Sequence, residues 1–135
     1  MTNPFLTDWT TKNGAVPYDI IKLEHFKPAI DHYLKLAYEK IESIKANTET
    51  SNFDNTILAI EGITEDLDMP VSVYFNLVGV ESDSAFKDLA NEISPLLAQL
   101  SNAITADSTL FEKVKVVFDS KGKKCGYCIF CTTTV

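Results

Sequence analysis

The sequence contains no arginine. Its positive charge comes from 12 lysines, which stand against 19 acidic residues and leave a formal net charge of −7 at pH 7. Proteins that bind nucleic acids neutralise phosphates with clustered Lys and Arg, and they read bases mainly with Arg. Anionic membrane surfaces also attract basic clusters. The composition therefore predicts that neither a nucleic acid nor a membrane is a partner of this chain.

Long apolar runs and targeting signals are missing as well. No apolar run in the sequence approaches the ~18 residues that are needed to cross a bilayer. Residues 1–5 have neither the basic region nor the apolar stretch of a secretory signal, and the chain has no N-x-S/T sequon. These absences predict a cytoplasmic location.

The motifs of common hydrolases are absent from the 135 residues. The two histidines, His25 and His32, lie seven residues apart, which is about 10 Å along a helix. A metal shared on one helix needs a spacing of three or four, as in the HExxH motif. No G-x-S-x-G elbow occurs, and the five glycines are too scattered for a phosphate-binding loop. We therefore predict no catalytic residue, no bound cofactor, solvated carboxylates and ordinary helical roles for both histidines.

Cysteine is absent from residues 1–124, and then three cysteines fall within seven residues. Cys125, Cys128 and Cys131 form a C-x-x-C-x-x-C run. Structural zinc takes four ligands, commonly as two pairs separated by a loop, and a redox C-x-x-C site needs a βαβ context. The run is therefore a weak metal candidate. Three interpretations stay open: an unstructured or non-native tail, adventitious metal or disulfide chemistry, and a functional metal or redox site.

The sequence does have strong helical periodicity. Hydrophobic residues make up 45% of its 135 residues, which is enough for one globular domain with a core. Apolar residues recur at spacings of three and four in segments that short polar loops separate. The predicted fold is all-α, an antiparallel bundle of about four to five helices after an irregular N-terminal arm over residues 1–24. The helices are expected over residues 25–45, about 54–80, 84–105 and 108–119.

Three prolines lie within the expected helices. Pro28 suits the first turn of the first helix, where its missing N–H costs nothing. Pro70 is expected to kink or end the second helix, and Pro95 is expected to bend the third. Residues 71–80 have strand propensity, but a helix is predicted because long helices flank them. Within this segment, residues 73–77 (VYFNL) are predicted to be core.

The last helix is expected to begin at the capping residues Asp107 and Ser108 and to stop near Asp119. Residues 1–119 hold nine lysines and 19 acids, a balance of −10, whereas residues 120–135 hold three lysines and no acid. Helical periodicity ends at the same point. We therefore predict a helical domain over residues 1–119 and a Cys-rich tail over residues 120–135 that is disordered or translated out of frame.

Five segments resemble one known family, in the same order and with matching spacing. Residues 18–29 (YDIIKLEHFKPA) resemble its F-x-x-I-x-x-E-H-F-x-P-A entry segment, and residues 53–57 (FDNTI) resemble its F-E-N-T-I helix start. Residues 73–77 (VYFNL), 92–95 (EISP) and 110–115 (LFEKVK) resemble V-F-F-N-L, E-I-S-P and L-F-x-R-V-K. The chain is thereby similar to the thimet oligopeptidase, oligopeptidase A and dipeptidyl carboxypeptidase family of zinc metallopeptidases.

The resemblance covers about residues 3–119 and implies an all-helical enzyme that cleaves short peptides within a deep channel. It places this chain in the N-terminal helical part, which forms a wall of that channel. In the family, a zinc-activated water and a general-base Glu carry out the hydrolysis, and the HExxH helix that supplies them lies far downstream. The resemblance therefore implies zinc for the full-length protein and none for this chain, which is expected to be inactive alone.

The sequence departs from the family pattern at two points, and we hypothesise that the chain is a truncated gene or a gene-model fragment. Pro70 stands where the family usually has another residue, and the sequence after Asp119 no longer matches the acidic, helical continuation. The leading hypothesis is an N-terminal fragment whose partners are the missing catalytic domain or short peptides. Two alternatives remain: a stand-alone helical module that binds peptides or proteins, and a small metal-binding protein that acts through its cysteine tail.

Overall fold

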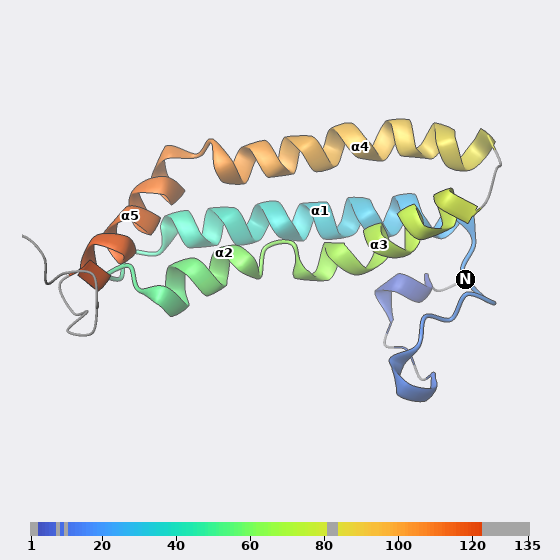
Figure 1. Cartoon of the computed structure of the whole chain (residues 1–135), viewed down its shortest axis with the longest axis horizontal. Coiled ribbons are helices and arrows are strands. Elements are labelled where there is room, and N and C mark those ends of the chain that lie inside the picture. Colours follow the sequence, from blue (N-terminus) through green and yellow to red (C-terminus); the bar gives the residue numbers. More distant parts are fainter. Residues whose placement is uncertain (1–2, 8, 10, 81–83, 123–135) are drawn as a thin grey trace, which may run out of the picture.

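Every regular element in the described part of the chain is helical. The computed structural model describes residues 3–7, 9, 11–80 and 84–122 (Figure 1). Its long helices are α1 (Leu23–Ala46), α3 (Glu65–Val80), α4 (Ser84–Thr105) and α5 (Ser108–Gly122). No strand occurs within these residues, which confirms the all-α prediction. None of the described helices combines the length and the apolar character that a membrane span requires.

The shorter elements lie in the N-terminal arm and ahead of α3. They are the 3-10 turns η1 (Pro4–Leu6) and η2 (Lys12–Gly14), the π-helical stretch η3 (Phe53–Leu58) and the short helix α2 (Ala59–Glu61) that continues it. The side chains of Asn52 and Asn55 each accept the other's backbone N–H, at 2.9 and 2.8 Å. This reciprocal capping fixes the point at which the chain enters η3.

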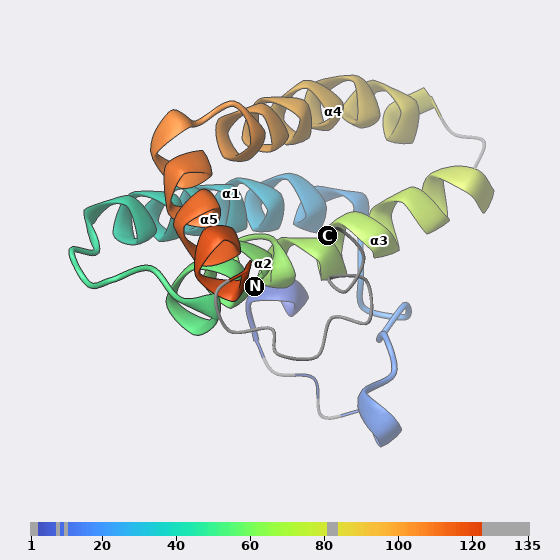
Figure 2. The ribbon, with the colours of Figure 1, turned by 60° about the vertical axis from the view of Figure 1, so that its left-hand side comes forward.

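The central helix is α1, which lies between α3 and α4 (Figures 1 and 2). Consecutive long helices in this layer run antiparallel, as predicted. α4 therefore runs in the same direction as α1, because the chain has first returned through α2 and α3 (Figure 1). α5 then crosses the end of the layer, beside the C-terminal end of α1.

The core is built along α1, which buries a side chain at every third or fourth position. These residues are Phe26, Ala29, Ile30, Leu34, Ala37, Ile41 and Ile44. Tyr74 of α3 packs edge-on against Phe26, with ring centroids 5.2 Å apart. Ile93 and Leu100 of α4 close the core from the other side. Burying each large side chain contributes about 1.5–3 kcal/mol, so this stripe determines where α3 and α4 pack.

The N-terminal arm is attached to α1. Phe5 is only 5% exposed and lies with its ring centroid 5.0 Å from that of Phe26. The Asn3 side chain donates to the carbonyl of His25 at 2.7 Å. The Tyr33 hydroxyl donates to the carbonyl of Phe5 at 2.5 Å. One apolar anchor and two hydrogen bonds therefore hold η1 on the helix.

The start of α1 differs from the prediction. The helix begins at Leu23, where the backbone N–H of Lys22 donates to Nδ1 of His25 at 3.1 Å. The N–H of His25 in turn donates to the carbonyl of Lys22 at 3.0 Å. Pro28 is thus the sixth residue of α1 and lies beyond the first turn, so its predicted position is wrong. The His25 side chain supplies a cap that the proline pattern did not reveal.

The break before α3 also differs from the prediction, because it lies at residues 62–64 and not at Pro70. Glycine has the lowest helix propensity after proline, and Gly62 forms this connection. The carbonyl of Thr64 then accepts the N–H groups of Leu67 and Asp68, both at 2.9 Å, and so starts α3. Pro70 is buried inside α3, where packing outweighs the loss of one helical hydrogen bond.

The remaining predicted helices are present with small shifts, and the bend expected at Pro95 stays a prediction. Residues 71–80 are helical, as predicted, and α4 continues through Pro95. α5 reaches Gly122, three residues past the expected stop at Asp119. The predicted domain boundary at that point stays a prediction.

Candidate functional site

Two of the possible metal ligands are held in α1. His25 caps the start of the helix. His32 lies seven residues farther along the helix, where it is exposed, and its ring is edge-on to that of Tyr33 with centroids 5.4 Å apart. Among the residues that the structure describes, no group of three or more His, Cys, Asp or Glu side chains could hold a metal ion. Outside the described residues lie Cys125, Cys128 and Cys131.

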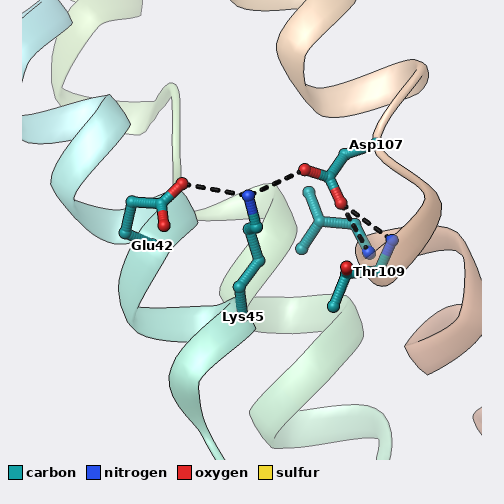
Figure 3. Close-up of polar contacts among 5 residues, drawn as sticks. Glu42, Lys45, Asp107 and Thr109 are labelled. Atoms are coloured by element: carbon teal, nitrogen blue, oxygen red, sulfur yellow. Dashed lines mark hydrogen bonds and ion pairs between the residues drawn. The ribbon is translucent and has the colours of Figure 1, made fainter.

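A polar cluster joins the end of α1 to the start of α5 (Figure 3). Oδ1 of Asp107 accepts the backbone N–H groups of Thr109 and Leu110, at 2.8 and 3.1 Å. Its Oδ2 lies 3.0 Å from Nζ of Lys45, which is also 3.0 Å from a carboxylate oxygen of Glu42. Asp107 therefore caps α5, as predicted, and also holds that helix to α1.

The electrostatics of this cluster favour a structural role. The pKa of Asp107 lies below its ordinary value of 3.8, first because the N–H of Leu110 donates to the carboxylate and then because Lys45 does. The pKa of Lys45 lies above its ordinary 10.5, chiefly through its hydrogen bonds to Asp107 and Glu42. A general base must accept a proton near neutral pH. A carboxylate whose charged form is stabilised in this way is unsuited to that task, so the cluster is an anchor.

A second anchor lies six residues farther along the chain, in α5. Nζ of Lys113 donates to the carbonyl of Asn47 at 2.6 Å, just after α1 ends. Carbonyls at a helix C-terminus lack intrahelical donors, and a cation there also interacts favourably with the helix dipole. Lys45 and Lys113 thus hold the two sides of the same junction.

An open groove lies between α3 and α4, with a volume of about 290 Å³. It is lined mainly by apolar side chains and edged by polar ones; the residues are Thr64, Leu67, Asp68, Val71, Leu97, Leu100, Ser101, Ile104 and Thr105. Leu67 and Leu100 are almost completely buried, whereas Leu97 and Ile104 stay half-buried. Helical periodicity identifies these leucines as an apolar stripe, but it does not show that two such stripes leave a groove between them.

The charge along the groove is of one sign. The α3 side carries Asp68, and α3 contains no lysine. Lys87 is the single lysine of α4 and lies near its start, away from the groove-lining residues. Lys40 of α1 approaches α3 but binds Asp66, at 2.8 Å. The groove is therefore apolar inside and negative at its α3 edge.

Residues 73–77, predicted to be core, divide between two environments. Val73 and Tyr74 are buried, and the Tyr74 hydroxyl donates to the carbonyl of Phe86 in α4. Phe75 is 42% exposed and Asn76 is exposed as well, so the core prediction is wrong for these two residues. The reason is geometric, because α1 covers a single face of α3 and neighbouring residues in a helix point about 100° apart.

The fold and its groove define a small all-α domain, and no protein-family model matches it. Sequence comparison relates the domain to bacterial peptidases. The dipeptidyl carboxypeptidase of Escherichia coli (strain K12) is 32% identical to this chain over 119 residues, which are 88% of the chain and 18% of the relative. The dipeptidyl carboxypeptidase of Salmonella typhimurium (strain LT2) is 32% identical over 120 residues, which are 89% of the chain and 18% of that protein.

These matches confirm the resemblance drawn from the five sequence segments: over most of its length, the chain is similar to part of two dipeptidyl carboxypeptidases. It spans less than a fifth of their length, 18% in both cases. The described residues do not fit a zinc ion, because His25 is used as a helix cap and no three-ligand group is present among them.

Proposed function

We propose that this chain is the N-terminal helical part of a cytoplasmic zinc metallopeptidase that cleaves short peptides, and that it does not hydrolyse peptides by itself. The observation that supports this proposal is the asymmetry of the matches, which cover 88% of this chain and 18% of the E. coli peptidase. The sequence has no HExxH motif in its 135 residues, so the zinc ligands and the general base of such an enzyme would have to lie in the rest of the polypeptide.

A peptidase assay tests this proposal. The purified chain is incubated with quenched fluorescent short peptides, with added zinc and with a chelator, beside the intact E. coli dipeptidyl carboxypeptidase as a positive control. We expect turnover by the control and none by the chain, with or without zinc. If the chain hydrolyses the peptides in a zinc-dependent reaction that the chelator abolishes, the proposal is wrong.

A stand-alone binding module is a second candidate, favoured by exposed aromatic side chains on α5. Phe111 and Phe118 are 66% and 75% exposed and lie seven residues apart, on one face of the helix. Exposed apolar patches mark interaction surfaces. Self-association in sedimentation experiments that is lost in a Phe111→Ser/Phe118→Ser variant would support a module of this class. A wild-type chain that sediments as a monomer, like the variant, would argue against it.

A further inference from the structure

We propose that the groove between α3 and α4 is the docking site for a helix of the remaining peptidase polypeptide, and that this helix inserts apolar side chains and places a Lys or Arg beside Asp68. The inference rests on the proposed function, because the partner is the part of the protein that the relatives possess and this chain lacks.

The size of the groove fits the side chains of a helix. Its volume of about 290 Å³ is roughly twice that of an engineered ~150 Å³ protein cavity that holds benzene. It therefore accommodates about two large apolar side chains. A helix in a groove presents such side chains at spacings of three and four residues. Leu97 and Ile104, seven residues apart on α4 and both half-buried, offer matching contacts along the groove.

Some apolar side chains of the groove remain partly exposed, and a partner could cover them. Leu67 and Leu100 are 3% and 2% exposed and already belong to the core of this chain. Val71, Leu97 and Ile104 pack against that core but remain partly open to solvent. Covering them removes apolar surface from water, which is the usual driving force for association.

Charge determines which kind of partner fits. The α3 edge presents Asp68, and no lysine of α3 or of the groove-lining part of α4 offsets its charge. A second copy of this chain would bring another net charge of −7 to this edge and be repelled. A helix with Lys or Arg next to its apolar residues gains a favourable pair with Asp68 instead.

The length of the relatives favours a tethered helix over a free peptide. The relatives extend far beyond the matched region, which is 18% of their length. A helix held within that larger folded chain is already ordered, and its attachment gives it a high local concentration. A free short peptide loses conformational entropy when it becomes ordered in the groove, so it binds there with lower affinity than the tethered helix.

Nuclear magnetic resonance tests the proposal directly. The full chain carries ¹³C-labelled Leu, Ile and Val methyl groups and is titrated with overlapping synthetic peptides that cover the E. coli relative outside its matched region. We expect peptides with apolar residues at helical spacing and an adjacent Lys or Arg to shift the methyl signals of Leu97, Leu100 and Ile104. Peptides from the matched region and scrambled versions serve as controls and are expected to leave these signals unchanged.

Two matched variants distinguish specific docking in the groove from nonspecific binding. Ser101→Trp fills the groove from an exposed position, and Gln99→Trp adds the same side chain on the opposite side of α4. We expect Ser101→Trp to weaken binding about tenfold and Gln99→Trp to leave it within about twofold, with both variants folded as judged by circular dichroism. Asp68→Asn is expected to weaken binding and to reduce its salt dependence.

Three outcomes would overturn the proposal. In the first, no peptide from the remaining polypeptide shifts the methyl signals of the groove. In the second, the shifts are confined to the face of α5 that carries Phe111 and Phe118. In the third, unrelated short substrate peptides bind the groove more tightly than the peptides from the remaining polypeptide. Hydrolysis of any peptide is followed in the same samples by mass spectrometry. Zinc-dependent cleavage would contradict the proposed function, whereas intact peptides without shifts at the groove would contradict the docking site alone.

Discussion

At the residue scale, buried or capped polar groups fix how the helices meet. Asp107 joins α5 to α1, and Tyr74 joins α3 to α4 through the carbonyl of Phe86. The cap formed by Asp107 is predictable from the sequence, because a capping residue and its helix are neighbours in the chain. Its partner Lys45 is not predictable in this way. Helical periodicity places Lys45 on the polar side of α1, and only the crossing of α5 brings the two together.

Replacing Asp107 should reveal both of its roles. At neutral pH we expect the order of stability to be wild type, then Asp107→Asn, then Asp107→Ala, because Asn keeps the cap and loses the charge while Ala loses both. Thermal unfolding followed by circular dichroism measures this order. Asp88→Asn, on an exposed position of α4, is the charge-matched control and should change little.

The pH dependence gives a second test of the same residue. The folded-state pKa of Asp107 lies below its ordinary 3.8, so its stabilising contribution is present above that value and is lost as the pH falls through the folded-state pKa. The difference in melting temperature between wild type and Asp107→Ala should therefore shrink as the pH is lowered from 7 into this acidic range. A difference that stays constant with pH would show that the charge of Asp107 contributes nothing.

The hydroxyl of Tyr74 should contribute measurably to the α3–α4 contact. Tyr74→Phe keeps the packing of this fully buried ring and removes its hydrogen bond to Phe86, so we expect a loss of about 1 kcal/mol in the free energy of unfolding. Urea denaturation measures it. Tyr18→Phe, at a position that is 51% exposed, should fall within about 0.5 kcal/mol of wild type, and equal effects of the two changes would contradict the role of the hydrogen bond.

At the scale of elements, periodicity predicts which segments are helical but not where each helix ends. Residues 71–80 became a helix despite their strand propensity, because they continue the face that α3 packs on α1. Pro70 was expected to kink or end the second helix, but α3 continues through it and the interruption lies at residues 62–64. Lys40 of α1 stabilises this break by donating to the carbonyl of Gly62 at 2.7 Å. Such a tertiary contact leaves no trace in the local sequence pattern.

The N-terminal arm should detach when its apolar anchor is removed. We expect Phe5→Ala to cost roughly 3 kcal/mol and to speed hydrogen exchange at the arm amides, because the side chain is 5% exposed and packs on Phe26. Urea denaturation and hydrogen–deuterium exchange measure the two effects. Leu6→Ala, at a neighbouring position that is 43% exposed, is the control. A comparable loss of stability in the two variants would contradict the role of Phe5 as the anchor of the arm.

At the scale of the whole molecule, the sequence predicts the fold class and the family, whereas the groove needs the structure. Five short segments are enough for the family because their order and spacing combine into one pattern, and the two bacterial relatives confirm it. The groove depends on how far α3 and α4 stand apart on α1, which is set by packing across the molecule. No pattern within either helix encodes that separation.

We propose that this chain is one part of a longer zinc metallopeptidase. The genomic DNA sequence that follows the codon of Val135 tests this proposal. We expect a reading frame there, offset from the codons of residues 120–135, that encodes acidic, helical sequence and then an HExxH motif. Downstream DNA that encodes no such motif in any frame would overturn the proposal.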